Sequence, residues 1–222
     1  MHLIGEQGVG IFLFVVLALQ GGAMLVCTGR FLQIKPEGQG IVMAENYFNT
    51  AILILFIPLI AVSLIIGWYQ ILDLTHLDIA IPWLIYGLEA IGIALIICGT
   101  AMVVFGFIAL RNNFQPGGFA PRSQDPLVTW SIYSLVRNPL NAGVLSVTLG
   151  LALVVQSLFV IALFIIYLIL ALRVLSIEEN QLSEAFAEEY RSYSQKVKRL
   201  VPFIYLPKMD KRGNTELWKE YW

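Results

Sequence analysis

The long stretches without a charged side chain limit what this chain can fold into. No Asp, Glu, Lys or Arg lies between Asn46 and Leu72, and Glu89 is the one charged residue between Ile79 and Leu110. An α-helix needs about 20 apolar residues to cross the hydrocarbon core of a bilayer. Only 13% of the chain is charged, which is about half the share of a soluble domain. We therefore expect an all-α integral membrane protein rather than a soluble enzyme, a disordered chain or a nucleic-acid-binding protein.

Four apolar runs predict the membrane-spanning helices. They cover residues 9–28, 50–70, 83–110 and 141–175. The last run is too long for one span, and Gln156-Ser157 near its middle indicates a tight helical hairpin made of residues 141–155 and 158–175. Pro58 is expected to kink the second span. The expected total is about five transmembrane helices.

The basic residues predict the orientation in the membrane. Lys and Arg occur in the connection after the first span, in the connection after the third and from Arg173 to the end of the sequence. The N-terminal tail, residues 71–82 and the hairpin tip contain none. Because cytoplasmic connections carry the excess of Lys and Arg, we expect the N-terminus outside and the third connection and the C-terminal segment in the cytoplasm.

Glycines repeat at intervals of seven residues and predict how two helices meet. Gly92, Gly99 and Gly106 lie on the third span, and Gly143 and Gly150 lie on the fourth. Small residues let helix backbones approach closely in lipid. We therefore expect these glycines to serve helix packing.

Two helix ends on the cytoplasmic side carry the polar residues that suggest a site. Arg137, Asn138 and Asn141 surround the start of the fourth span, where the backbone N–H groups favour an anionic ligand group. Glu178 and Glu179 follow the fifth span, where a carboxylate is costly unless it is paired. A tight hairpin places both ends together. Residues 182–197 continue as an amphipathic, cytoplasmic helix, and a dipolar ligand would suit the site.

Two motifs then give a family resemblance. The stretch LVTWSIYSLVRNPLNAG, residues 127–143, is followed about 35 residues later by EENQLSEAFAEEYRSY, residues 178–193. The pair resembles the isoprenylcysteine carboxyl methyltransferase and phospholipid methyltransferase superfamily, whose pattern is LVTxGPYxxxRHPxYxG, a helical hairpin and EExxLxxxFGxxYxxY. The resemblance implies a membrane-embedded S-adenosylmethionine-dependent methyltransferase that acts on a lipophilic carboxylate, thiol or amine. Residues 1–110 would form a three-helix transmembrane region, and residues 111–222 the methyltransferase-like region.

The resemblance also implies roles for individual residues. The cofactor-binding residues would be Leu127, Val128, Tyr133, Arg137, Asn138, Pro139, Leu140, Asn141, Gly143, Glu178 and Glu179. Leu127, Val128 and Tyr133 would line the nucleoside, and Glu178 would bind a polar group of S-adenosylmethionine and assist an amine acceptor. Arg173 would meet an anionic head group of the substrate. The sequence has no Cys/His cluster with the spacing of metal ligands, so we expect no metal site.

The chain departs from the family pattern at four positions of interest. Ser131 and Ala187 stand where the pattern has glycine. Asn138 stands in place of the common histidine, and Asn141 in place of the common tyrosine. The loss of an aromatic ring at Asn141 is the main argument for a different interpretation, a non-catalytic membrane protein that retains the fold.

A third interpretation is an NADPH-dependent membrane sterol or lipid reductase, because such enzymes share a similar C-terminal motif and hairpin. A 2′-phosphate needs basic residues near the pocket, and Arg122, Arg137 and residues 196–199 are candidates. The methyltransferase is the leading hypothesis. We expect a lipophilic or lipidated substrate and membrane lipids as partners, and no nucleic acid, while the methyl acceptor and the oligomeric state stay open.

Overall fold

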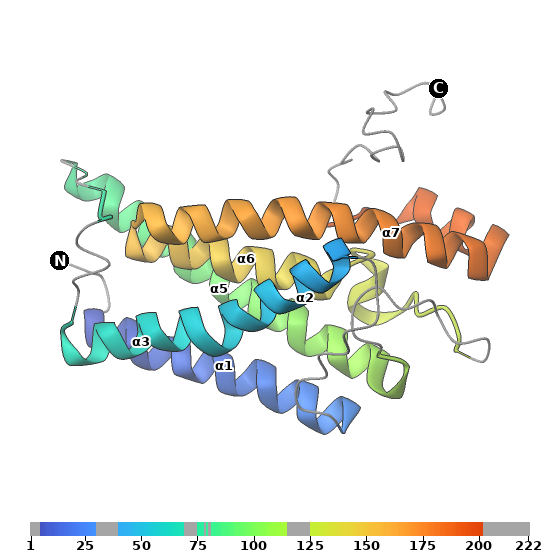
Figure 1. Cartoon of the computed structure of the whole chain (residues 1–222), viewed down its shortest axis with the longest axis horizontal. Coiled ribbons are helices and arrows are strands. Elements are labelled where there is room, and N and C mark those ends of the chain that lie inside the picture. The colour runs from blue at the N-terminus through green and yellow to red at the C-terminus, as the bar shows by residue number, and fades with distance from the viewer. Residues whose placement is uncertain are drawn as a thin grey trace.

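A computed structural model describes residues 5–29, 40–68, 75–77, 79, 81–114 and 125–201. The helices of this part of the chain are α1 (Glu6–Thr28), α2 (Gly40–Ala51), α3 (Ile57–Ile66), α5 (Pro82–Leu110), α6 (Pro139–Val155) and α7 (Leu158–Lys196). They run along one long direction as a bundle, as Figure 1 shows, and the described residues form no β-strand. The expected all-α fold is confirmed.

Four of the helical segments are long and apolar enough to cross a membrane. They are α1, the continuous stretch Gly40–Ile66, α5 and α7. Helix α6 is also apolar but has only 17 residues. The helices therefore lie where the five spans were expected, and the fourth of them is shorter than an ordinary span. This composition supports a membrane protein, as expected.

The predicted hairpin joins α6 and α7 and is closed by backbone hydrogen bonds. Gln156 adopts the left-handed conformation (φ 52°), which ends α6, and Ser157 precedes α7. The segment 75–77 lies across this tip. The Leu77 N–H donates to the Gln156 carbonyl oxygen at 2.8 Å, and the Leu158 N–H donates to the Thr75 carbonyl oxygen at 2.8 Å. The tight tip forces α6 and α7 to run antiparallel, as Figure 1 shows.

The second span contains a π-helical turn beside its proline. The turn η1 (Ile52–Phe56) joins α2 to α3, and Pro58 lies in the first turn of α3. Proline has no N–H to donate to the carbonyl of Ile54, so the regular hydrogen-bond ladder is interrupted there. The expected kink thus takes the form of a π-helical turn, a feature that is frequent at functional sites.

The predicted glycine contacts hold α5 against α6. A Cβ atom on Gly150 would lie 2.5 Å from the carbonyl oxygen of Gly92, and one on Gly99 would lie 2.6 Å from the carbonyl oxygen of Gly143. A Cβ on Gly106 would lie 2.7 Å from the Leu140 side chain. Because real Cβ contacts are not that short, both helices need glycine here. This close packing sets the position at which α6 begins.

Helix α7 is longer than the membrane requires and bends near its end. The 29 residues before its bend, 158–186, span about 44 Å, whereas the hydrocarbon core is about 30 Å thick. The predicted amphipathic helix is the continuation of α7, with a sharp bend at Ala187 (φ 42°, ψ −114°) after which the chain turns back, as Figure 1 shows. Ser131 also has positive φ, 59°. Both residues stand where the family pattern has glycine, so the backbone keeps a conformation that glycine adopts without strain.

The glycine contacts predict a stability difference between two variants. Gly150→Ala should lower the free energy of unfolding by about 1–3 kcal/mol, because its new Cβ meets the α5 backbone. Gly87→Ala on α5 is the matched control, since nothing lies within 4 Å of its Cβ position. That variant should be neutral or more stable by up to about 1 kcal/mol. Thermal unfolding in detergent measures both, and an equal effect of the two substitutions would contradict the packing.

The bend at Ala187 predicts a stabilising substitution. Ala187→Gly should raise the free energy of unfolding by about 1 kcal/mol, because relief of backbone strain exceeds the added freedom of the unfolded chain. Ala185→Gly changes the same exposed residue type at a regular helical position of α7. It should lower stability by about 1 kcal/mol. Loss of stability in both variants would show that Ala187 is not strained.

Candidate functional site

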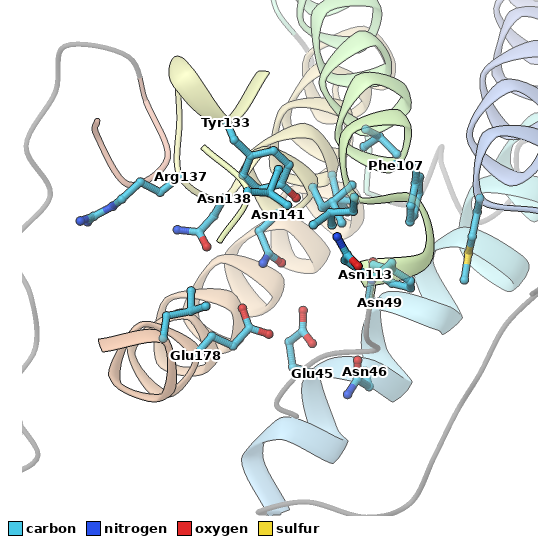
Figure 2. Close-up of a pocket in the computed structure, with 18 of the residues that line it drawn as sticks. Glu45, Asn46, Asn49, Phe107, Asn113, Tyr133, Arg137, Asn138, Asn141 and Glu178 are labelled. Atoms are coloured by element: carbon cyan, nitrogen blue, oxygen red, sulfur yellow. The ribbon is translucent and has the colours of Figure 1, made fainter. Parts of the chain in front are cut away.

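A cavity of about 460 Å³ lies at the end of the bundle where α6 begins, a size typical of ligand pockets. Its walls come from α1, α2, η1, α5, residues 125–138, α6 and α7. Figure 2 shows side chains from α2 and α7 facing those from the start of α6 and the end of α5. Segments that are far apart in the sequence therefore share one site.

Most of the residues that the family resemblance selects line this cavity. They are Leu127, Val128, Tyr133, Arg137, Asn138, Leu140, Asn141 and Glu178. Residues 125–130 form neither helix nor strand and are followed by the short 3₁₀ turn η3 (Ser131–Ser134). Pro139 then starts α6, where its missing N–H costs nothing. This local structure carries the LVT motif along one wall of the cavity.

Four selected residues lie outside the cavity lining. Pro139 forms the first turn of α6, and Gly143 packs against Gly99 of α5. Arg173 is exposed on the surface of α7. Glu179 is buried behind the cavity wall. Gly143 and Glu179 thus make contacts within the protein that hold the walls in place.

Tyr133 is held firmly in the cavity wall. The Tyr193 hydroxyl donates a hydrogen bond to the Tyr133 carbonyl oxygen at 2.6 Å. Burial raises the pKa of the Tyr133 hydroxyl well above its usual value, and the nearby Tyr193 and Glu178 raise it further. The Tyr133 ring therefore offers the cavity a neutral aromatic surface.

Glu179 is the centre of a buried ionic cluster. One of its oxygens lies 3.0 Å from Arg137 Nη2, and the other lies 3.4 Å from Arg199 Nε. Arg199 Nη2 donates to Ser176 Oγ at 2.8 Å, and Asn138 Nδ2 donates to the Arg199 carbonyl oxygen at 3.2 Å. Buried charges are tolerated when they are paired in this way. The cluster joins the start of α6 to α7 and to residues 198–199.

An aromatic ring from α7 borders the position at which the family pattern loses one. The Tyr167 hydroxyl donates a hydrogen bond to Asn141 Oδ1 at 3.2 Å. Tyr167 is fully buried and lines the cavity. Aromatic surface is therefore present beside Asn141, although it comes from a different helix.

The sequence analysis missed the polar residues that α2 contributes. Glu45, Asn46 and Asn49 line the cavity, together with Asn113 beyond the end of α5. Figure 2 shows the carboxylates of Glu45 and Glu178 pointing toward each other. Glu45 and Asn49 are four residues apart, so they share a helix face. That spacing, directly before an uncharged run, was the available signal.

Apolar side chains form another part of the cavity lining. Leu17 and Met24 of α1 line it, together with Leu53 and Ile54 of η1. Ile54 is also 50% exposed on the outer surface of the bundle. An apolar ligand could therefore reach the cavity from the side that faces lipid.

The charges of the described cavity lining are unbalanced. They comprise the carboxylates of Glu45, Asp125 and Glu178 and a single guanidinium, that of Arg137. Arg137 is already paired with Glu179. The cavity thus favours a ligand with cationic groups at its polar end and apolar groups at the other.

The ionic cluster predicts a large loss of stability when Glu179 is neutralised. Glu179→Gln should lower the free energy of unfolding by about 3–5 kcal/mol, because Arg137 and Arg199 would keep buried charges without a counter-charge. Glu188→Gln removes the same charge from an exposed ion pair with Arg191. It should change stability by about 0.5 kcal/mol or less. Similar unfolding temperatures for the two variants would contradict a structural role for Glu179.

Comparisons with known proteins found two similarities. A family model described as phospholipid methyltransferase matches residues 88–189, which run from α5 through the cavity wall into α7. No curated protein sequence matches the chain. Among solved structures, the chain is similar in fold to a eukaryotic intramembrane Ras methyltransferase, isoprenylcysteine carboxyl methyltransferase. The TM-score is 0.57 at 18% identity, and the match covers 90% of this chain and 68% of that one. Residues 88–189 are thus similar to the phospholipid methyltransferase family, and the likeness to the solved methyltransferase is a likeness of fold.

Proposed function

We propose that this protein is an S-adenosylmethionine-dependent methyltransferase that acts on a lipophilic or membrane-associated acceptor. The observation that carries the proposal is a cavity with acidic side chains at one end and apolar side chains at the other, built around the family motifs. When bound, S-adenosylmethionine supplies a methyl group that its positively charged sulfur activates. The similarity of residues 88–189 to the phospholipid methyltransferase family supports this reaction type.

The polar end of the cavity suits this cofactor by charge. S-adenosylmethionine carries a sulfonium and an ammonium group against one carboxylate, so its net charge is positive. The carboxylates of Glu45, Asp125 and Glu178 favour a cation there. Leu127, Val128 and Tyr133 would hold the nucleoside in the proposed arrangement.

The apolar end of the cavity suits the acceptor. An acyl or prenyl chain could enter from the bilayer past Ile54, which both lines the cavity and faces outward. The protein would hold the acceptor in line with the methyl group and keep water away, and such alignment is worth up to about 7–11 kcal/mol. A carboxylate or thiolate acceptor needs no base. An amine acceptor must lose a proton, which Glu178 would accept. The basic residues that follow α7 support a cytoplasmic position for this end.

The charge of the cavity favours this proposal over an NADPH-dependent reductase. A dinucleotide with a 2′-phosphate is strongly anionic and needs several cationic side chains. Arg137 is the one cationic residue of the described lining, and Glu179 already neutralises it. Arg122, a candidate for that role, lies outside the described residues. Tyr167 beside Asn141 likewise weakens the argument for a non-catalytic protein.

The proposed cofactor contact predicts a binding difference. Detergent-purified protein should bind S-adenosylhomocysteine in calorimetry, and Glu178→Gln should bind it about tenfold more weakly, because a charge-assisted hydrogen bond is lost. The exposed Glu188→Gln is the charge-matched control and should bind like the unchanged protein. Unchanged affinity of Glu178→Gln would refute the assigned contact. Binding of NADPH in place of S-adenosylhomocysteine would favour the reductase.

The reaction itself can be tested without knowing the acceptor. The protein should transfer isotopically labelled methyl groups from S-adenosylmethionine to one class of lipophilic molecule in a total lipid extract, and mass spectrometry would identify that class. Omission of the protein is the control. Label in no lipid or small molecule, with S-adenosylhomocysteine binding intact, would argue against catalysis.

A further inference from the structure

Glu45 is a buried carboxylate with no hydrogen-bond or ion-pair partner among the described residues. It is 4% exposed and lies on α2, outside the region that the family model matches. Among the residues that the structure describes, it makes no hydrogen bond or ion pair. Figure 2 shows its carboxylate directed into the cavity. Burying a carboxylate costs free energy unless a positive or hydrogen-bond-donating group faces it. A ligand with such a group would therefore be stabilised next to Glu45.

Two carboxylates and an amide oxygen line the same cavity. The Glu178 carboxylate of α7 faces Glu45 across the cavity, as Figure 2 shows. Asn49 follows Glu45 by one helical turn, and its Oδ1 is buried without a hydrogen-bond partner. One cation with N–H groups would give Glu45 and the Asn49 oxygen a partner, and its charge would offset the repulsion between the two carboxylates.

The residues around the two carboxylates favour an organic cation over a metal ion. The described residues include no group of three or more His, Cys, Asp or Glu side chains that could hold a metal ion. Leu53 and Ile54 of η1 follow Asn49 along the chain and also line the cavity, so the cavity has apolar surface beyond the carboxylates. An organic ammonium group with an apolar remainder fits both features.

We propose that Glu45 and Glu178, with Asn49, form a subsite for an organic ammonium group. The inference rests on the proposed function, because it names the chemistry that one part of the same cavity recognises. The ammonium group comes either from the amino-acid part of the cofactor or from an amine acceptor. Glu45 is a binding residue in both cases.

The test uses the full-length protein in detergent and two pairs of probes. One pair is S-adenosylhomocysteine and its analogue in which hydrogen replaces the amino group. The other pair is octylammonium and the neutral octanol. Calorimetry compares the unchanged protein, Glu45→Gln and, as the charge-matched control, the exposed Glu188→Gln.

The two sources of the ammonium group predict different outcomes. If it belongs to the cofactor, Glu45→Gln weakens S-adenosylhomocysteine binding about tenfold or more and leaves the analogue without the amino group unchanged. If it belongs to the acceptor, Glu45→Gln keeps S-adenosylhomocysteine binding and loses the preference for octylammonium over octanol. Glu188→Gln should behave like the unchanged protein in both arms.

Other results would overturn the inference or only the proposed function. If Glu45→Gln binds all four probes with the affinities of the unchanged protein, the proposed subsite is wrong. The unchanged protein could instead fail to bind S-adenosylhomocysteine and still prefer octylammonium over octanol, with that preference lost in Glu45→Gln. This result would support the ammonium subsite and refute the proposed cofactor. If Glu45→Gln does not fold, Glu178→Gln tests the same subsite from α7. Its binding of the same four probes is then compared with that of the unchanged protein.

Discussion

The buried ion pairs of Glu179 hold together the parts on which the site depends. They connect Arg137, at the end of the loop that forms one wall, with α7 and with Arg199 beyond its end. The hydrogen bond from Tyr167 of α7 to Asn141 of α6 adds a second link between the same two helices. Glu178, the neighbour of Glu179, turns into the cavity instead. Two neighbouring carboxylates thus have different surroundings, because Glu179 is buried in the wall and Glu178 lines the cavity.

The cavity combines two environments that a membrane methyltransferase needs at the same place. Its acidic end lies where α2, α6 and α7 meet, and its apolar end lies along α1 and η1. The glycine contacts between α5 and α6 hold the two helices in one position along each other. They thereby place the start of α6, with its polar residues, beside the end of α5. The π-helical turn beside Pro58 places Leu53 and Ile54 in the apolar wall. Helix packing that serves stability therefore also shapes the site.

Much of the fold was predictable because membrane helices leave strong local signals. The uncharged runs located the spans, Gln156-Ser157 located the hairpin, and the seven-residue glycine spacing identified the helix contact. The site was less predictable. Eight of the residues chosen from the family motifs line the cavity, but Glu45, Asn49 and Tyr167 were missed. They belong to helices whose sequences resemble ordinary spans, and nothing local indicates what faces them across the bundle.

The sequence by itself determined the helical membrane fold, the hairpin and the motifs around Asn138 and Glu178, because charge, proline and glycine act within a few residues of their own position. Only the tertiary structure decided which of two adjacent glutamates is buried in an ionic cluster and which faces the cavity. It also brought Glu45 of α2 opposite Glu178 of α7. Such pairings depend on the distance and angle between helices, which are set by packing over the whole bundle.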